Sequence, residues 1–343
     1  MRINFLLPHL KPSGGVNAVL SFAHEMSERG HGVIVSIENK SLSRYYRNIL
    51  NSHPLLPKKS KVKIVHAKTI SDLPDADILF ADSWTRAEKL HELDKKGLKF
   101  EYIQHDERMY HGDPEKVDRV YCLPLIKIVN SSWLKELFEK EYHYKAEVLF
   151  NAVDCNFFHP LKEKRKDDDI RILLLHHDYE WKGTKEGVEI ISDLKKKYPN
   201  IKLILFGTRM EKIEYSCDEY HYNAFKKNLA ELFRGCDIFL GSSWDEGLNF
   251  PPRWAMASGC SLVTYDNGSS RDYAFNRETA MVAERKNKDE LLQKLEELIV
   301  NTELREKISK QGIEYVKKMP TWKELAEKME KIFLKHLNNK NKV

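Results

Sequence analysis

The segment from Glu246 to Pro252 combines residue types that suit a phosphorylated sugar. Glu246 and Gly247 come shortly after an apolar run, Ile238–Gly241, and two prolines end the segment. Proline is favoured at the first positions of a helix, so we expect a helix to begin there. A carboxylate next to backbone N–H groups at a helix start can bind a sugar hydroxyl beside a phosphate. A loop with a solvated glutamate is the alternative interpretation.

A second candidate, Ser13-Gly14-Gly15, lies between the first expected strand and the first expected helix. Two glycines allow the backbone to come close to a ligand. The N–H groups at the start of the following helix suit an anion such as a diphosphate. Because the segment lacks the full glycine spacing of a dinucleotide-binding loop, a tight turn explains it equally well.

Neither the acidic runs nor the cysteines predict a metal site. Asp75-Ala76-Asp77 has the Asp-x-Asp form but adjoins a strand, and Asp167-Asp168-Asp169 is typical of a solvated linker. The 5 cysteines are scattered, and no two have the spacing of a zinc or redox pair. We therefore expect no metal, and reduced thiols in a cytoplasmic protein.

The candidates fall between strands and helices that alternate along the chain. A polar stretch at 161–169 divides two series of apolar, β-branched runs. Alternation of this kind predicts parallel sheets, whose ligands bind beyond the carboxyl ends of the strands. The expected strands are Arg2–Leu7, His31–Ile37, Val62–Val65, Ile78–Ala81, Phe100–Ile103, Ile126–Val129 and Ala146–Phe150, then Ile170–Leu175, Ile201–Phe206, Ile238–Gly241 and Ser261–Tyr265.

Several motifs, taken in order, resemble family 4 retaining glycosyltransferases. The segment 229–260 around Glu246 is similar to the donor-site signature of that family. Gln104-His105-Asp106-Glu107 and Ser131-Ser132-Trp133-Leu134 resemble bacterial rhamnosyltransferase-like members that build surface polysaccharides. The match spans nearly the whole chain and rests on the sum of its motifs. The other matching stretches are Gly14-Gly15-Val16, Asn151-Ala152-Val153-Asp154 with Phe158, Trp181-Lys182-Gly183 and Gly268–Tyr273.

The resemblance implies an α/β fold of the GT-B type, with two Rossmann-like doubly wound domains facing across a cleft. We predict an N-terminal acceptor domain at 1–158 and a nucleotide-sugar donor domain at 159–319. A C-terminal helix at 320–343 would cross back to the first domain, with Trp322 as its anchor or as ordinary core packing.

The resemblance also implies roles for single residues. Glu246 would contact hydroxyls of the donor sugar. His105 would lie near the anomeric carbon, although a structural histidine or one in an acceptor loop is the alternative. The groups that would hold the diphosphate are Lys182, the backbone of Gly247, Leu248 and Asn249, and, from the other domain, Gly14 and Gly15.

Two positions depart from the family pattern. A second glutamate usually follows the first by eight positions and binds the ribose, but Trp254 stands there. Its indole cannot accept a hydrogen bond. His177 stands where the family has a phosphate-binding arginine, and histidine lacks the charged fork of a guanidinium. These changes predict either an altered donor, such as a deoxyribose nucleotide, or reduced activity.

Length and charge limit the remaining choices. A chain of 343 residues fits two domains of typical size. A formal charge of +5 is too small an excess for a dedicated nucleic-acid binder. No apolar run reaches the roughly 18 to 20 residues of a membrane span. Contact with the inner face of a membrane through lysine-rich helices is left open, as is the oligomeric state.

The resemblance implies a retaining, metal-independent glycosyltransferase without a cofactor, in surface polysaccharide synthesis. It would move a sugar from a nucleotide diphosphate to a glycan or lipid-linked acceptor. A silent GT-B protein that binds a nucleotide sugar or glycan is one alternative, motivated by Trp254 and His177. A nucleotide-sugar epimerase and a non-enzymatic interaction module are the others.

Overall fold

The structure is a computed structural model that describes residues 1–11, 13–38, 56, 60–94, 97–161, 167–208, 215–224 and 227–340. The chain forms two compact units. Unit 1 contains Met1–Ala152 together with Pro320–Val343, and unit 2 contains Val153–Met319. The first division comes a few residues before the predicted boundary at 158. Most of the predicted linker, residues 162–166, lies outside the described residues.

Unit 1 contains a parallel sheet, which is seven-stranded in the described residues. Its strand order is β3-β2-β1-β4-β5-β6-β7, so the order reverses beside β1. β1 is buried at five of its six positions, as expected for a central parallel strand covered on both faces. The strands are β1 (Arg2–Leu7), β2 (Gly32–Glu38), β3 (Lys63–Ala67), β4 (Ile78–Ala81), β5 (Leu98–Ile103), β6 (Ile126–Val129) and β7 (Glu147–Val148).

Helices cover this sheet. The first of them starts at the predicted glycine segment, and the Ser13 hydroxyl accepts a hydrogen bond from the Val16 N–H at its start. Such a cap satisfies one of the N–H groups that a helix start leaves without a partner. The helices of unit 1 are α1 (Gly14–Glu28), η1 (Ile70–Asp72), α3 (Trp84–Glu92), α4 (Glu107–Tyr110), α5 (Pro114–Tyr121), α6 (Ser132–Glu141) and α12 (Trp322–Lys340).

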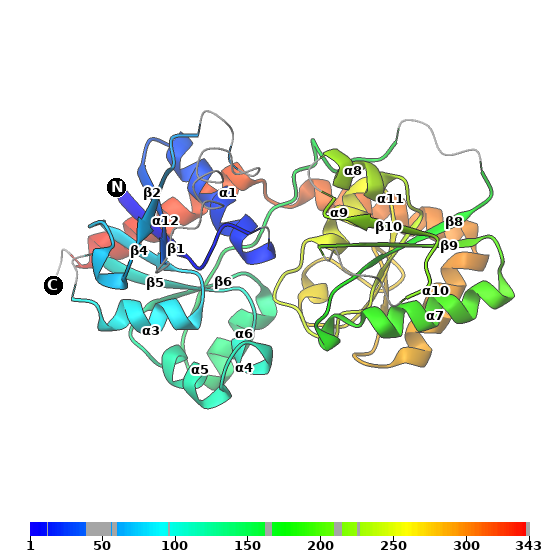
Figure 1. The fold of residues 1–343 in the computed structure, drawn as a ribbon, viewed down its shortest axis with the longest axis horizontal. Coiled ribbons are helices and arrows are strands. Elements are labelled where there is room, and N and C mark those ends of the chain that lie inside the picture. The colour runs from blue at the N-terminus through cyan, green and yellow to red at the C-terminus, as the bar shows by residue number, and fades with distance from the viewer. Residues whose placement is uncertain are drawn as a thin grey trace. The chain divides into compact units, whose positions relative to one another are not determined.

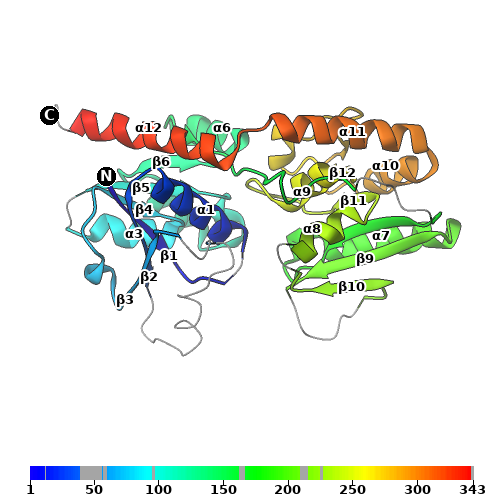
Figure 2. The ribbon, with the colours of Figure 1, turned by 90° about the horizontal axis from the view of Figure 1, so that it is seen from above.

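The last helix, α12, packs within unit 1 although it follows unit 2 in the sequence (Figures 1 and 2). The Phe333 ring contacts the Phe100 ring of β5 edge-on, with ring centres 4.9 Å apart. Trp322 makes a similar edge contact with Phe22 of α1 at 5.1 Å. Glu330 adds an ion pair to His31 at 2.7 Å. α12 is therefore part of the unit 1 core.

Unit 2 contains a second parallel sheet, with the order β10-β9-β8-β11-β12-β13. β8 lies between β9 and β11, so the strand order reverses there as it does at β1 in unit 1. The strands are β8 (Ile170–Leu175), β9 (Ile201–Gly207), β10 (Glu219–Tyr222), β11 (Ile238–Gly241), β12 (Ser261–Tyr265) and β13 (Met281–Ala283). The helices are η2 (Glu180–Lys182), α7 (Thr184–Lys197), α8 (Lys227–Arg234), α9 (Pro251–Ser258), η3 (Ser269–Asp272), α10 (Lys288–Val300) and α11 (Thr302–Lys318).

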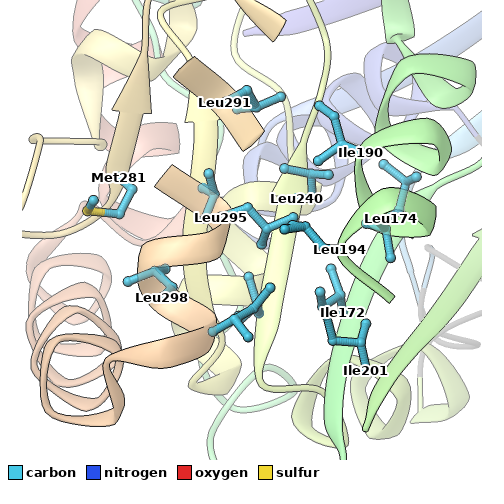
Figure 3. Packing of buried hydrophobic residues seen from close by; sticks show 14 of the residues in the cluster. Ile172, Leu174, Ile190, Leu194, Ile201, Leu240, Met281, Leu291, Leu295 and Leu298 are labelled. Carbon is cyan, nitrogen blue, oxygen red and sulfur yellow. The ribbon is translucent and has the colours of Figure 1, made fainter. Parts of the chain in front are cut away.

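The core of unit 2 lies between its sheet and helices α7 and α10 (Figure 3). Leu291, Leu295 and Leu298 of α10 recur at helical spacing and are fully buried. They pack with Ile190 and Leu194 of α7 over the central strands. The predicted doubly wound α/β fold is thus confirmed in each unit. The carboxyl ends of β8 and β11 are held next to one another.

Candidate functional site

Two loops of unit 2 meet at the carboxyl ends of the neighbouring strands β8 and β11. The first loop runs from His176 to Gly183 and the second from Ser242 to Phe250. The Trp244 N–H donates to the Trp181 carbonyl at 2.8 Å. Because β8 and β11 are adjacent where the strand order reverses, this is the place where doubly wound sheets bind ligands.

Gly183 allows the two loops to approach closely. Its φ is +65°, in the left-handed region, and a Cβ atom there would lie 2.1 Å from the Ser242 carbonyl oxygen. The Ser242 hydroxyl in turn donates to the Lys182 carbonyl at 3.1 Å. A side chain at Gly183 would therefore force the loops apart.

Lys182 and Glu246 lie side by side where the loops meet. The Lys182 Nζ is 2.6 Å from the Glu246 Oε1, and the two side chains are 18% and 6% exposed. The Glu246 N–H donates to the Asn267 carbonyl at 2.9 Å, which joins this segment to the loop after β12. A cation and a carboxylate are thus fixed together at a nearly buried position.

A pocket opens at this point of unit 2. Its polar lining includes Lys182, Glu246, Ser242 and Asn249, and Pro251 and Pro252 form part of its wall. The two prolines are the first residues of α9, and proline has no N–H group. The start of α9 therefore presents fewer N–H donors than the sequence led us to expect. Of the residues 247–250 before the helix, Asn249 lines the pocket.

His177 lies at the end of β8 and carries no charge at neutral pH. Burial, and to a lesser extent the nearby Lys182, lowers the pKa of His177 from 6.5 to about 4. The Tyr179 N–H donates to the His177 Nδ1 at 3.1 Å, so the proton of the neutral ring is on Nε2. His177 can offer a phosphate one neutral donor, in contrast to the charged fork of an arginine.

Trp254 packs in an aromatic cluster and is not one of the residues that line the pocket. Its ring stacks on Phe158 at 4.9 Å and on Phe250 at 5.2 Å, and it meets Phe233 edge-on. Trp254, which stands in place of the expected ribose-binding glutamate, thus packs α9 against neighbouring elements.

Gly14, Gly15 and His105 belong to unit 1. A Cβ at Gly15 would lie 3.0 Å from the side-chain nitrogen of Gln104, so the glycine loop and the loop after β5 are close neighbours. The His105 Nδ1 contacts the Asp106 carbonyl at 2.9 Å, and its buried Nε2 has no hydrogen-bond partner among the described residues. Unit 1 brings these three predicted residues to one edge of its sheet.

Sequence reasoning assigned no role to three buried residues of α9 and of the loop after β12. Arg253 is fully buried in α9, and Tyr273 is fully buried in the loop after β12. Asn267, also buried, donates to the Ser243 carbonyl. A charge inside an otherwise apolar helix, as in Pro251–Ser258, is the signal that could have singled out Arg253.

The described part of the chain lacks two further features. No group of three or more His, Cys, Asp or Glu side chains is placed there to hold a metal ion. In the same residues, no helix combines the length and the apolar character that crossing a membrane requires.

Comparison with known proteins shows what the region around this site is similar to. Residues 158–315 match the family described as glycosyl transferases group 1. The O-antigen biosynthesis protein RfbC of Myxococcus xanthus is 24% identical over 71% of this chain, and the match spans 20% of that protein. An N,N'-diacetylbacillosaminyl-diphospho-undecaprenol alpha-1,3-N-acetylgalactosaminyltransferase of Campylobacter jejuni is 29% identical over 38% of this chain and 35% of its own length.

Solved structures show the same fold. Anabaena HepE, in a crystal structure with UDP and glucose, superimposes with a TM-score of 0.76 over 98% of this chain and 100% of its own, at 13% identity. The chain therefore has the GT-B fold of two Rossmann-like units. The match to glycosyl transferases group 1 falls within residues 158–315, and Lys182, Glu246 and Asn249 lie inside that range.

Proposed function

We propose that this glycosyltransferase moves a sugar, with retention and without a metal, from a nucleotide diphosphate to a glycan or lipid-linked acceptor. The observation that carries the proposal is the contact of Lys182 with Glu246 at the pocket beyond β8 and β11. Glu246 would bind hydroxyls of the donor sugar. Lys182 would stabilise the charge that develops on the diphosphate as it leaves.

The relatives support a role in surface polysaccharide synthesis. One is named for O-antigen biosynthesis, and another for transfer of N-acetylgalactosamine to a lipid diphosphate. The matched structure of HepE contains UDP and glucose. These names favour a nucleotide sugar as donor and a glycan or lipid-linked acceptor. Contact with the inner face of a membrane is a further part of the proposal.

The choice of nucleotide is a separate part of the proposal. A glutamate in place of Trp254 would accept a hydrogen bond from a ribose hydroxyl, and Trp254 is instead stacked on Phe158. A deoxyribose nucleotide, which has no 2′-hydroxyl, loses less from that change. We therefore propose a dTDP-sugar as the preferred donor.

A thermal-shift panel of UDP-, GDP-, dTDP- and ADP-sugars tests the donor. A ligand at about 100 times its dissociation constant adds roughly 2.7 kcal/mol of stability to the state that binds it. We expect the largest rise in melting temperature with dTDP-sugars. An equal rise with UDP-sugars would remove the deoxyribose explanation, and no rise with any of them would contradict nucleotide-sugar binding.

Substitution of Glu246 tests the chemistry. We expect Glu246→Gln to slow release of the nucleoside diphosphate by about 100-fold or more, since a group that acts in the transition state is lost. Glu189→Gln is the matched control, because Glu189 is an exposed carboxylate of α7 paired with Lys288. The anomeric configuration of the product by NMR tests retention, and turnover in EDTA tests metal independence.

A catalytically silent protein that binds a nucleotide sugar is the second candidate, favoured by the neutral His177 and the packed Trp254. Binding in the panel without any donor turnover, in the presence of glycan and lipid-linked acceptors, would support it. Turnover that disappears in Glu246→Gln would exclude it.

A further inference from the structure

Arg253 is a fully buried arginine in α9, beside the pocket of unit 2. Its Nε donates to the Asn249 carbonyl at 3.0 Å, and its Nη2 donates to the Leu248 carbonyl at 3.3 Å. The guanidinium carbon lies 5.3 Å from the centre of the Phe250 ring. Arginine keeps its proton in proteins and is rarely buried, so this position needs an explanation.

The two carbonyl contacts determine how the backbone of the loop is turned. A peptide bond is planar and trans, so its N–H points away from its C=O. The carbonyl of Leu248 faces Arg253, and the N–H of the same peptide, which belongs to Asn249, therefore points to the opposite side. Arg253 holds the Asn249 N–H in one direction.

The side chain of Asn249 is oriented in the same way. Its Oδ1 lies 2.9 Å from the Tyr273 hydroxyl and 3.2 Å from the Ser269 hydroxyl, and each is placed to donate to it. Burial raises the pKa of Tyr273, so its hydroxyl stays protonated. With Oδ1 engaged on this side, the Asn249 Nδ2 amide group is turned away from Tyr273.

Asn249 lines the pocket from this loop, as Glu246 does. Asp245 to Leu248 and Phe250 are buried, whereas Asn249 is partly exposed and lines the pocket with Lys182 and Glu246. Its carbonyl and its Oδ1 are both occupied by unit 2 itself. The backbone N–H and the side-chain Nδ2 amide of Asn249 are therefore the groups that can donate to an anion in the pocket.

We infer that Arg253 is a positioning residue of the donor site: it turns the amide groups of Asn249 toward the diphosphate, and Tyr273 completes the arrangement. The inference rests on the proposed function, because it supplies donors to the diphosphate of the proposed substrate. Lys182 would balance the charge of that group, and Asn249 would set its position. Arg253 itself does not touch the ligand.

Isothermal titration of dTDP, dTMP and inorganic pyrophosphate tests this role. We expect Arg253→Met to raise the dissociation constants of dTDP and pyrophosphate about tenfold, and that of dTMP much less. Arg253→Lys keeps one donor and should restore part of the loss. Arg234→Met is the matched control, since Arg234 of α8 makes the same kind of contact, Nε to the Ala230 carbonyl at 3.2 Å, elsewhere in unit 2.

Two milder variants keep the test decisive if Arg253→Met does not fold. Asn249→Asp preserves an oxygen for Tyr273 and replaces the proposed donor by an acceptor, so pyrophosphate binding should be lost. Tyr273→Phe should weaken it several-fold. Binding of dTDP and pyrophosphate unchanged by these variants would overturn the inference alone. If the wild-type chain binds none of the nucleotides in the donor panel, the proposed function fails and this inference fails with it.

Discussion

At the scale of single residues, the loop after β8 contributes one positive charge, that of Lys182, because His177 in the same loop is neutral. Lys182 points to Glu246, and His177, five positions earlier, is kept neutral mainly by burial. A second charge beside Lys182 would be repelled, so the neutral histidine is consistent with its surroundings. The site thus differs from one built on an arginine and a lysine.

The lowered pKa of His177 predicts how the stability of the folded chain depends on pH. In the unfolded chain the ring gains a proton below about pH 6.5, but in the folded chain only below about pH 4, so the unfolded state binds more protons between these values. Stability should therefore fall as the pH is lowered through this window. In His177→Asn we expect the loss between pH 7 and pH 4.5 to be smaller by about 1 to 2 kcal/mol, after allowance for partial exposure.

Urea unfolding at both pH values measures this difference. His159→Asn is the control, because His159 is an exposed histidine of the same unit. Equal pH dependence in the wild type and His177→Asn would contradict the assignment of a lowered pKa to the buried ring.

The sequence predicted some of the site residues but not the contacts between them. The carboxylate at Glu246 and the cation at Lys182 could be named, because resemblance placed them in known motifs. Their contact could not be derived, since the two lie far apart in the chain and meet only through the pairing of β8 with β11. Arg253 was missed because a charged residue in a helix is expected to face solvent.

At the scale of elements, the site depends on the close approach of the loops after β8 and β11. Gly183→Ala would place a methyl group 2.1 Å from the Ser242 carbonyl oxygen, at a φ of +65°. We expect this variant to lose about 2 kcal/mol or more of stability, from backbone strain and displacement of the loop, and to lose pyrophosphate binding.

Gly30→Ala is a control that separates the steric clash with Ser242 from the backbone strain of a positive φ. Gly30 also has a positive φ, +88°, but its Cβ would meet no atom within 4 Å. This control should show the strain cost alone, about 1 kcal/mol, with ligand binding intact. Similar effects on binding for both variants in titration calorimetry would argue against loop contact as the cause.

A buried ion pair joins two elements of unit 1. Glu101 of β5 and Lys127 of β6 stand opposite one another, 2.6 Å apart, with side chains 0% and 1% exposed. Lys127→Met should cost about 3 to 5 kcal/mol, because it leaves a buried carboxylate without its cation. In the double variant with Glu101→Met as well, we expect most of that loss to be recovered. Urea unfolding measures both, and a double variant as unstable as Lys127→Met would contradict this account.

The elements themselves were largely predictable where the strands are apolar. The runs Ile170–Leu175 and Ser261–Tyr265 were expected with the bounds that the structure has, since buried parallel strands are rich in apolar residues. Two strands at the edges of the unit 2 sheet were missed. β10 (Glu219–Tyr222) is polar and partly exposed, and β13 (Met281–Ala283) is only three residues long, so neither has a recognisable period.

At the scale of the whole molecule, unit 1 is assembled from two distant parts of the sequence. Its sheet comes from the first part, and α12 comes from the end of the chain, after unit 2. The aromatic residues of α12 close the core above β4 and β5. Folding of unit 1 therefore needs residues that follow the whole of unit 2, whereas unit 2 is continuous in sequence.

This arrangement predicts that the core contacts of α12 stabilise one unit and not the other. Phe333 is fully buried against Phe80 and Phe100, so Phe333→Ala should cost about 3 to 5 kcal/mol. Hydrogen exchange should become faster in the peptides of β1, β4 and β5, while exchange in unit 2 and pyrophosphate binding stay unchanged. Leu334→Ala, at an exposed neighbour on the same helix, is the control and should alter neither unit. Faster exchange throughout unit 2 in Phe333→Ala would show that the two units unfold together.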